Sequence, residues 1–405
     1  MVCWARGVPA SSRRDGRAQK MEARTMDLNR HTGRRDLCRT RGFTLLELLV
    51  VIAIISVVLA LLLPAIGGAR NVARNATTQT LMRGFGDAVD KFRQDNDGRT
   101  PGVFTARQMG HQDNENLGFT AMENVLLDLA GGVVTPDSRD ATIHYAFGPS
   151  NDAIQENQRY GPAGRFVRPD FIGSDGPGYF IPPSKYFVEQ ERGPDGSHFQ
   201  QSASSANQAP IPAFVDAWGT PMLLWVEDEF GPRDIRNIDD FARRNASGGS
   251  SRFYWASNAG FLRSLALGDR GRNQTWAASG STAPSLIGDG APTSSIPVTM
   301  TGFLGNPSYP GEFNGVNTLP NAARGRIVIQ SAGTDGIFLA ASDSGAINSG
   351  ASQRSGGGNY TIAGGGLRYG RNFFTGDGAR LERNGSPATE DVAERFNDLF
   401  QSFGN

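Results

Sequence analysis

The sequence predicts an α+β protein in which a long N-terminal α-helix packs on an antiparallel β-sheet head with long loop insertions. Three observations lead to this prediction: an apolar run from Phe43 to Leu63, an amphipathic stripe from Leu81 to Phe92, and short β-type segments separated by glycine-rich stretches. Gly makes up 52 of the 405 residues, which favours a loop-rich, β-containing globule over a helical bundle.

The apolar run is long enough to cross a membrane. From Phe43 to Leu63 the only polar side chains are those of Thr44, Glu47 and Ser56. As a helix rising about 1.5 Å per residue, the run spans roughly 32 Å, which covers the hydrocarbon core of a bilayer. A lone carboxylate inside such a helix costs about 2.5–3.5 kcal/mol on insertion scales, so Glu47 requires a compensating partner.

The amphipathic stripe continues the helix beyond the apolar run. Its apolar residues recur at the spacing of one helical face: Leu81, Phe85, Ala88, Val89 and Phe92. The pattern stops at residues 97–102, where glycine can cap a helix and proline cannot continue it. The helix is therefore predicted to have a membrane half and an amphipathic half that lies on the head.

The sheet under this stripe is expected to include Met222–Val226 and Arg326–Gln330. Apolar side chains alternate in both segments, as strands with a buried face require. The residues expected to face the helix are Leu224, Val226, Ile327 and Ile329.

Further elements are predicted from spacing and turn signals. A second helix is expected at Ala121–Leu129, and a closing helix at Thr389–Phe403 with Thr389 as its N-cap. The remaining β-candidates are Thr142–Phe147, Tyr179–Ile181, Pro212–Val215 and Ile337–Ala340. The stretches expected to form long surface loops are Gly193–Pro210, Asn245–Ser251, Ser279–Ser295 and Ser342–Gly366.

Charge divides the chain at the start of the apolar run. Residues 1–42 hold 11 basic and 4 acidic residues and carry a net charge of +7, so the remainder of this formally neutral chain carries −7. A basic segment before a membrane helix stays in the cytoplasm, which places the bulk of the chain on the other side. Met21 and Met26 are alternative starts, and a start at Met26 leaves 17 residues up to Gly42.

The segment Arg41-Gly42-Phe43-Thr44-Leu45-Leu46-Glu47 resembles the N-terminal signature of type IV pilins and type II secretion pseudopilins. The resemblance implies that a prepilin peptidase cuts between Gly42 and Phe43 and that Phe43 is then N-methylated. It implies that Glu47 neutralises the Phe43 ammonium of a neighbouring subunit during filament assembly, and that Pro64 is the helix-kinking proline. An ordinary signal anchor with Glu47 near its edge is the alternative.

The resemblance also implies an organisation and a location. Residues 1–42 would form a basic leader that is cleaved off, 43–66 a transmembrane and assembly helix, 67–98 an amphipathic helix on the head, and 99–405 a pilin-like globular head with insertions. The protein would sit in the inner membrane with a single pass and its head in the periplasm. Both cysteines, Cys3 and Cys38, lie in the leader, so no disulfide or thiolate metal site is expected after cleavage.

Two head segments resemble the type II secretion major pseudopilin. One is Asp216-Ala217-Trp218-Gly219-Thr220-Pro221, a turn leading into a strand, where Trp218 is expected to anchor the sheet. The other is Ser331-Ala332-Gly333-Thr334-Asp335-Gly336, which ends a strand. The head is longer than is usual in that family, and the extra length falls between Pro101 and Asp216 and between Phe230 and Arg324.

The resemblance implies a calcium ion near the second segment. Calcium takes six to eight oxygen ligands, and the candidates here are Asp335 and Asp343, with Asp377 or Asp391 as a distal partner. The acidic residues are spread over a longer glycine-rich stretch than in the family, so a plain turn at Asp335-Gly336 is the alternative.

No enzyme class is indicated by the sequence. The histidines His31, His111, His144 and His198 form no pair at metal-ligand spacing. There is no Gly-x-Ser-x-Gly segment, no Walker loop and no His-Glu-x-x-His. The acidic triplet Glu227-Asp228-Glu229 is interpreted as a solvated edge, and no catalytic residue is predicted.

Assembly is therefore the expected chemistry. The expected function is that of a structural subunit of a type II secretion pseudopilus, with prepilin peptidase, other pilin-like subunits and the inner-membrane secretion platform as partners and no nucleic acid. A subunit of a surface type IV pilus, and a membrane-tethered binding domain that uses the pilin signal for export, remain open.

Overall fold

The computed structural model describes most of the N-terminal helix and much of the head. The chain divides into two compact units, Met1–Leu62 and Leu63–Asn405. The described residues are 43–130, 133–134, 149, 166–167, 178–181, 183–188, 213–263, 285–291, 293–314, 317–340, 343, 352–355, 358–361, 367, 369, 382–383, 386–387 and 391–404.

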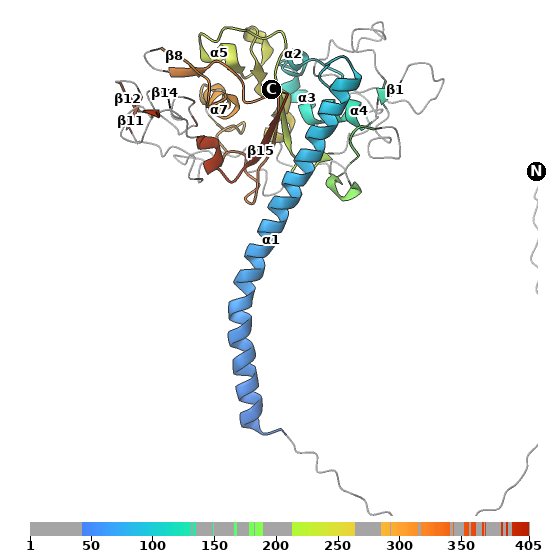
Figure 1. Ribbon diagram of the computed structural model, residues 1–405, viewed down its shortest axis with the longest axis vertical. Coiled ribbons are helices and arrows are strands. Elements are labelled where there is room, and N and C mark those ends of the chain that lie inside the picture. The colour runs from blue at the N-terminus through green and yellow to red at the C-terminus, as the bar shows by residue number, and fades with distance from the viewer. Residues whose placement is uncertain are drawn as a thin grey trace, which may run out of the picture. The chain divides into compact units, whose positions relative to one another are not determined.

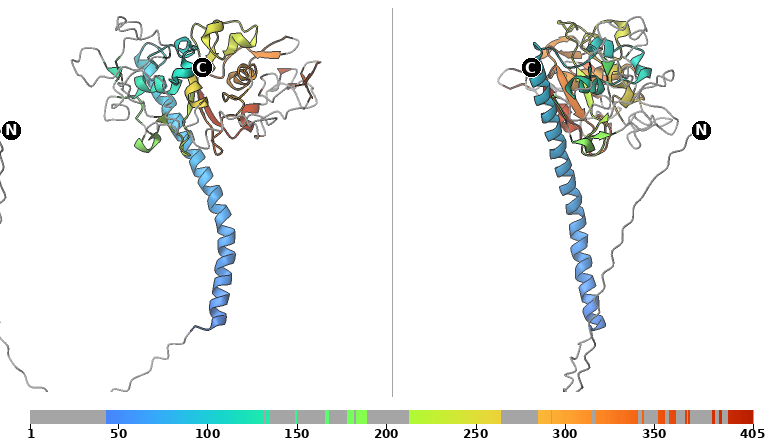
Figure 2. Two further views of the ribbon diagram at one scale, coloured as in Figure 1. Left: turned by 180° about the vertical axis from the view of Figure 1, so that it is seen from behind. Right: turned by 90° about the vertical axis from the view of Figure 1, so that its right-hand side faces the viewer.

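One helix, α1, runs from Leu45 to Asp95 (Figures 1 and 2). It contains Pro64 and continues through it. Its 51 residues correspond to about 76 Å at the usual rise. After α1 the chain turns through left-handed backbone at Asp97 (φ 52°) and Gly98 (φ 78°), and Gly98 N donates to Arg93 O at 2.7 Å. The stop predicted at this turn is confirmed.

The central sheet of the head has three antiparallel strands in the order β15-β10-β5. They are β5 (Leu223–Val226), β10 (Ile327–Ser331) and β15 (Leu399–Phe403). Ile327 lies opposite Val226 on one side and Phe403 on the other. The two predicted strands are thus confirmed as neighbours, and the antiparallel sheet and mixed α+β class are as expected.

The third strand corrects a prediction. Thr389–Phe403 was expected to be a helix, but the described part forms a short 3-10 helix, η8 (Val392–Arg395), followed by β15. Leu399 and Phe403 pack against the cluster that contains α1, whereas Phe400 packs on the opposite side of the sheet. In a strand with apolar residues on both faces, the distances in sequence between those residues can equal the distances that mark one face of a helix. Thr389 lies outside the described residues.

The sheet separates two hydrophobic cores. The core on the α1 side joins the predicted stripe to α4 (Ala121–Leu129), a helix found at the predicted bounds. Its buried members from α1 and the two predicted strands are Met82, Phe85, Ala88, Val89, Phe92, Met222, Leu224, Ile327 and Ile329, with Leu81 and Val226 partly buried beside them. At about 1.5–3 kcal/mol for each fully buried side chain, this interface attaches α1 firmly to the sheet.

The core on the other face is built by Trp225, Val328 and Phe400 with segments that the sequence did not predict. Chief among these is α7 (Ser295–Leu304), whose third residue is Pro297. Proline is tolerated in the first turn of a helix, although it weakens a helical prediction from spacing alone. α7 begins at Ser295, the last residue of the loop predicted over Ser279–Ser295.

A close approach between α1 and β15 depends on a glycine. A Cβ atom added at Gly86 would lie 1.9 Å from Cε1 of the Phe403 ring. Only a residue without a side chain leaves space for this ring against the helix. By contrast, a Cβ at Gly67 or Gly68 would meet no atom within 4 Å.

Shorter elements complete the head. Pro212–Val215 is confirmed in part by β4, while Tyr179–Ile181 and Ile337–Ala340 form no strand, and Thr142–Phe147 lies outside the described residues. The short helices are α2 (Ala106–Met109), α3 (Asn114–Leu117), α5 (Ile238–Phe241), α6 (Ala259–Leu262), η3 (Ser184–Tyr186), η4 (Ala246–Gly248) and η5 (Trp255–Asn258). The short strands are β1 (Val133–Val134), β2 (Phe166–Val167), β3 (Phe187–Val188), β4 (Ala213–Phe214), β6 (Ala242–Arg243), β7 (Phe253–Tyr254), β8 (Pro310–Asn314), β9 (Asn317–Pro320), β11 (Ser352–Ser355), β12 (Gly358–Thr361), β13 (Glu382–Arg383) and β14 (Ser386–Pro387).

Candidate functional site

The start of α1 is closed by a capping box between Thr44 and Glu47. The backbone N and the Oγ1 of Thr44 both donate to Glu47 Oε2 at 2.9 Å. In return, Glu47 N donates to Thr44 Oγ1 at 3.2 Å. This reciprocal pattern satisfies backbone donors that the first turn of a helix otherwise leaves unpaired. The sequence analysis missed this role of Thr44, although the Thr-x-x-Glu spacing is a known signal for it.

The same geometry leaves part of the Glu47 carboxylate available. Within the described residues, Oε1 of Glu47 accepts no hydrogen bond, and the side chain is exposed. Phe43 is also exposed, and Gly42 lies outside the described residues. Glu47 can therefore cap its own helix with one oxygen and accept a second donor with the other.

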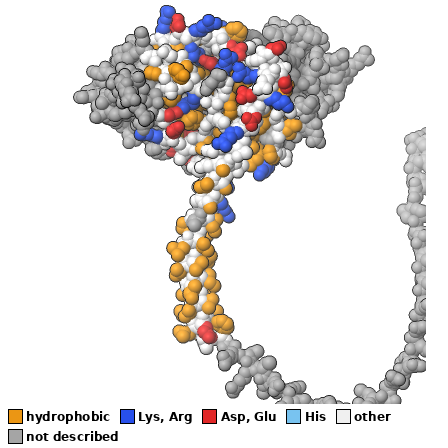
Figure 3. All heavy atoms as spheres, viewed as in Figure 1, with side chains coloured by type: hydrophobic (Ala, Val, Ile, Leu, Met, Phe, Trp, Pro, Cys, Tyr) orange, Lys and Arg blue, Asp and Glu red, His pale blue; other side chains and the backbone are white. Residues whose placement is uncertain are grey.

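The first half of α1 has the composition of a membrane span. A window of this helix has a mean hydropathy of 3.2 and none of it is buried, and it is the one helix of that kind in the described part of the chain. Figure 3 shows hydrophobic side chains covering the visible face of this half. Its remaining polar group is satisfied locally, since Ser56 Oγ donates to Ile52 O at 2.7 Å. One apolar N-terminal helix of this kind fits a single-pass membrane anchor.

The first head motif is organised by Asp216. Its Oδ1 accepts hydrogen bonds from Trp218 N at 2.9 Å and from Thr220 N at 2.8 Å, which closes the turn before β5. Gly219 takes the left-handed conformation (φ 80°) that this turn requires. Trp218 is only half-buried and lies outside both core clusters, so the prediction that it anchors the sheet is wrong.

Asp216 also joins the two head motifs that the sequence singled out. Ser331 Oγ donates to Asp216 Oδ2 at 2.6 Å, and both residues are buried. The same turn is tied to α1, because Ala217 N donates to the buried Thr78 Oγ1 at 3.2 Å. The two motifs and α1 are thus hydrogen-bonded to one another at one place in the head. Asp216 and Ser331 are 115 residues apart in the sequence.

Two of the four calcium candidates lie close together. Burial raises the pKa of the Asp335 carboxyl, and the charge of Asp343 raises it further. Asn397 links the pair: its side chain hydrogen-bonds Asp335, and its backbone N and Nδ2 donate to Asp343 at 2.9 and 3.1 Å. Burial also raises the pKa of Asp398 well above its usual range, and its two oxygens accept from Gln330 and Leu339.

The other two candidates do not join this pair. Asp391 forms a bidentate ion pair with Arg324, which is 9% exposed, and Asp377 lies outside the described residues. Among the described residues no group of three or more His, Cys, Asp or Glu side chains is placed to hold a metal ion. Two carboxylates fall short of the six to eight oxygens that calcium takes, so the described residues alone do not fit a calcium site.

The acidic triplet Glu227-Asp228-Glu229 is not the solvated edge that was predicted. Asp228 is only 4% exposed, and the side chain of Glu227 is 20% exposed beside Arg252, with 3.4 Å between Oε1 and Nη1. Burial raises the pKa of Glu227 against the opposing effect of Arg252 and Arg326. The sequence of three successive acidic residues does not reveal which side chain is buried, because burial depends on the segments that pack against the end of β5.

The N-terminal geometry agrees with the comparison against known families. Residues 37–63 match the family described as the prokaryotic N-terminal methylation motif. No curated protein and no solved structure matches the chain. The match covers residues 37–42, the capping box and the apolar half of α1. The methylation motif and the apolar helix that follows it therefore support a type IV pilin-like protein with an N-terminal apolar helix.

Proposed function

We propose that this protein is a structural subunit of a type II secretion pseudopilus, processed by prepilin peptidase and assembled through α1 to help export proteins across the outer membrane. The observation that carries the proposal is the methylation motif at residues 37–63, which ends in an exposed apolar helix with a single carboxylate. No catalytic role is proposed.

The assembly step follows from the chemistry of Phe43 and Glu47. Cleavage after Gly42 leaves an ammonium group on Phe43 beside an apolar helix, where an unpaired charge is expensive. Glu47 Oε2 is occupied by the cap of its own helix, while Oε1 is open to the Phe43 ammonium of a neighbouring subunit. Pairing the two charges lowers the cost of both and sets the axial register between subunits.

The second half of α1 couples assembly to the head. Its apolar stripe is buried between α4 and the central sheet, and Gly86 admits the Phe403 ring against the helix. A displacement of α1 in a growing filament therefore carries the head with it.

The choice of a pseudopilus over a surface pilus rests on the head. The two segments that resemble the major pseudopilin are hydrogen-bonded through Asp216 and Ser331, which supports their acting as one structural unit. The basic leader supports an inner-membrane location with the head in the periplasm, next to the secretion platform. A surface type IV pilus subunit is the second candidate, because the methylation motif is common to both.

N-terminal mass spectrometry of the protein purified from membranes tests the processing. We expect an N-methylated Phe43 at the new end, and an intact leader would contradict the proposal. Deletion of the gene then separates the two filaments. Loss of exoprotein export with normal surface piliation is expected for a pseudopilus subunit, and the reverse outcome would assign the chain to a surface pilus.

Calcium remains part of the proposal only for Asp335 and Asp343. A bound ion would stabilise the folded chain by about 2.7 kcal/mol at a hundredfold excess over Kd. Thermal melting of the full chain in calcium and in chelator measures this, and Asp335→Ala should abolish the difference. Asp234→Ala, at a residue whose side chain is 84% exposed, is the control and should preserve it. Identical curves for the unmutated protein would rule the ion out.

A further inference from the structure

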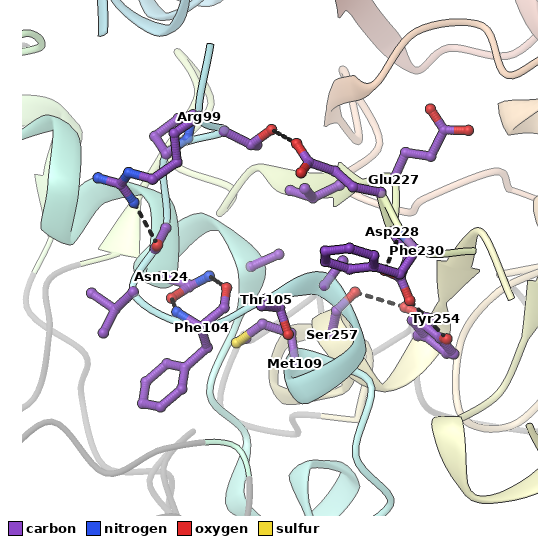
Figure 4. A pocket seen from close by; sticks show the side chains of 18 residues that line it. Arg99, Phe104, Thr105, Met109, Asn124, Glu227, Asp228, Phe230, Tyr254 and Ser257 are labelled. Carbon is purple, nitrogen blue, oxygen red and sulfur yellow. Dashed lines mark hydrogen bonds between the residues drawn. The ribbon is translucent and has the colours of Figure 1, made fainter. Parts of the chain in front are cut away.

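A cavity of about 250 Å³ lies within the head, among the loop after α1, the helices α2 and α4, and the chain that follows β5 (Figure 4). All of its lining residues belong to the second compact unit, and none comes from α1. The apolar side chains on its wall include the buried or half-buried Val103, Phe104, Met109, Ala121 and Val226. The cavity is thus large enough for one side chain or a small molecule with an apolar part.

A buried carboxylate on this wall has only neutral partners. Asp228 is 4% exposed, and its Oδ1 accepts from Phe230 N at 3.0 Å. Its Oδ2 accepts from the Tyr254 hydroxyl at 3.2 Å. Among the described residues no Lys, Arg or His forms an ion pair with it. Buried charges are ordinarily paired, so a cation in the cavity would supply the partner that Asp228 lacks.

The nearby arginines are engaged elsewhere. Arg99, which lines the cavity, donates to Asp128 at 2.9 Å. Arg252 lies beside Glu227, and Arg326 lies 4.0 Å from Glu229. These three arginines therefore lie beside other carboxylates, whereas Asp228 accepts hydrogen bonds from neutral donors.

An exposed aromatic ring stands next to this carboxylate. Phe230 is 80% exposed, more than any other large hydrophobic residue described in the second unit; Tyr309, for example, is 58% exposed. Its backbone is held by the hydrogen bond from its N to Asp228, and Figure 4 shows its side chain beside Asp228 and Tyr254. An aromatic face adjacent to a carboxylate is the combination that recognises ammonium and guanidinium groups.

We propose that this cavity binds a primary ammonium or guanidinium group carried on a short apolar stem. Asp228 pairs with the cation, Phe230 covers it, and the apolar wall holds the stem. The ligand is either a free amine or guanidine, or the side chain of a Lys or Arg presented by another protein. This inference goes beyond filament assembly, because it involves no residue of α1.

The test compares a charged ligand with its neutral isostere on the full chain in detergent micelles. The probes are agmatine, the peptide acetyl-Ala-Arg-Ala-amide and the same peptide with citrulline in place of arginine, each followed by ligand-observed NMR. The arginine peptide should bind about tenfold more tightly than the citrulline peptide, because only it can pair with Asp228. Equal binding of the two peptides overturns the proposal. Tighter binding of the arginine peptide than of agmatine assigns the site to a protein side chain, and equal binding assigns it to a free ligand.

Substitutions locate the site. Asp228→Asn should remove the difference between the arginine and citrulline peptides, and Phe230→Ala should weaken arginine binding by about threefold. Tyr309→Ala is the matched control at an exposed ring outside the cavity and should leave binding unchanged. If Asp228→Asn lowers the melting temperature so far that the chain is unfolded, Phe230→Ala decides alone, since that side chain is mostly exposed. Unchanged arginine binding in Phe230→Ala overturns the proposal.

Discussion

The two halves of α1 belong to one continuous helix, but their apolar side chains differ in burial. From Leu45 to Leu63 every side chain except those of Glu47 and Ser56 is apolar, and all are exposed. From Thr78 to Phe92 one stripe is buried in the head while the opposite face carries polar, exposed residues such as Asp87 and Asp90. The first half requires apolar surroundings that the described residues do not supply, and the second half packs against apolar residues of the head. An apolar side chain in α1 therefore stabilises the head only where it is buried against the head.

The largest effect expected from this comparison is at Phe85. Its side chain is fully buried, with the rings of Phe180 and Phe214 at centroid distances of 5.4 and 6.4 Å. Phe85→Ala should reduce the free energy of unfolding by about 3–5 kcal/mol, because it leaves a cavity in the α1-side core. Urea denaturation of the full chain in micelles, followed by tryptophan fluorescence, measures this loss.

The control for Phe85 lies in the other half of the helix. Val57 is 61% exposed, and Val57→Ala should leave the unfolding of the head within about 0.5 kcal/mol of the unmutated protein. Equal losses at both positions would mean that the two halves do not differ in what they stabilise.

A smaller effect is expected from the glycines of α1. Gly86→Ala places a methyl group against the Phe403 ring and should destabilise the head by about 1–3 kcal/mol through overpacking. Combining it with Phe403→Leu should restore part of that loss, since the smaller side chain gives way. The same denaturation experiment measures both variants.

Gly68→Ala is the matched substitution where a new Cβ would meet nothing within 4 Å. It should stabilise α1 by about 0.5–1 kcal/mol, because alanine has the higher helix propensity. A loss of stability at Gly68 equal to that at Gly86 would contradict the close approach between α1 and β15.

The smallest effect is expected at the N-terminal cap. Thr44→Ala removes the hydroxyl that pairs with Glu47 and should destabilise the first turn of α1 by about 1 kcal/mol. Amide hydrogen exchange at residues 46–48 in micelles measures this, and head denaturation should not change. Thr44→Ser keeps the hydroxyl and serves as the control. If Thr44→Ala exchanges like the unmutated protein, the Thr44 hydroxyl does not stabilise the first turn.

The spacing of apolar residues was sufficient to predict some elements together with the elements that pack against them. The stripe Leu81–Phe92 predicted a helical face, and the alternation in Met222–Val226 and Arg326–Gln330 predicted the strands beneath it. The prediction failed at Leu399–Phe403, where apolar residues on both faces of a strand gave helical spacing. It failed again at Asp228, because a row of three acids contains no information about which one is covered.

What the sequence by itself determined is the N-terminal machinery: the apolar span, the Thr44–Glu47 cap and the methylation motif depend on residues within a few positions of one another. Only the tertiary structure decided that β15 completes the sheet against Gly86, that Asp216 bonds to Ser331, and that Asp228 is buried beside neutral donors on a cavity wall. Each of these contacts joins segments distant in the chain. These contacts are stabilised by packing between the distant segments, so they cannot be inferred from any single local stretch of the sequence.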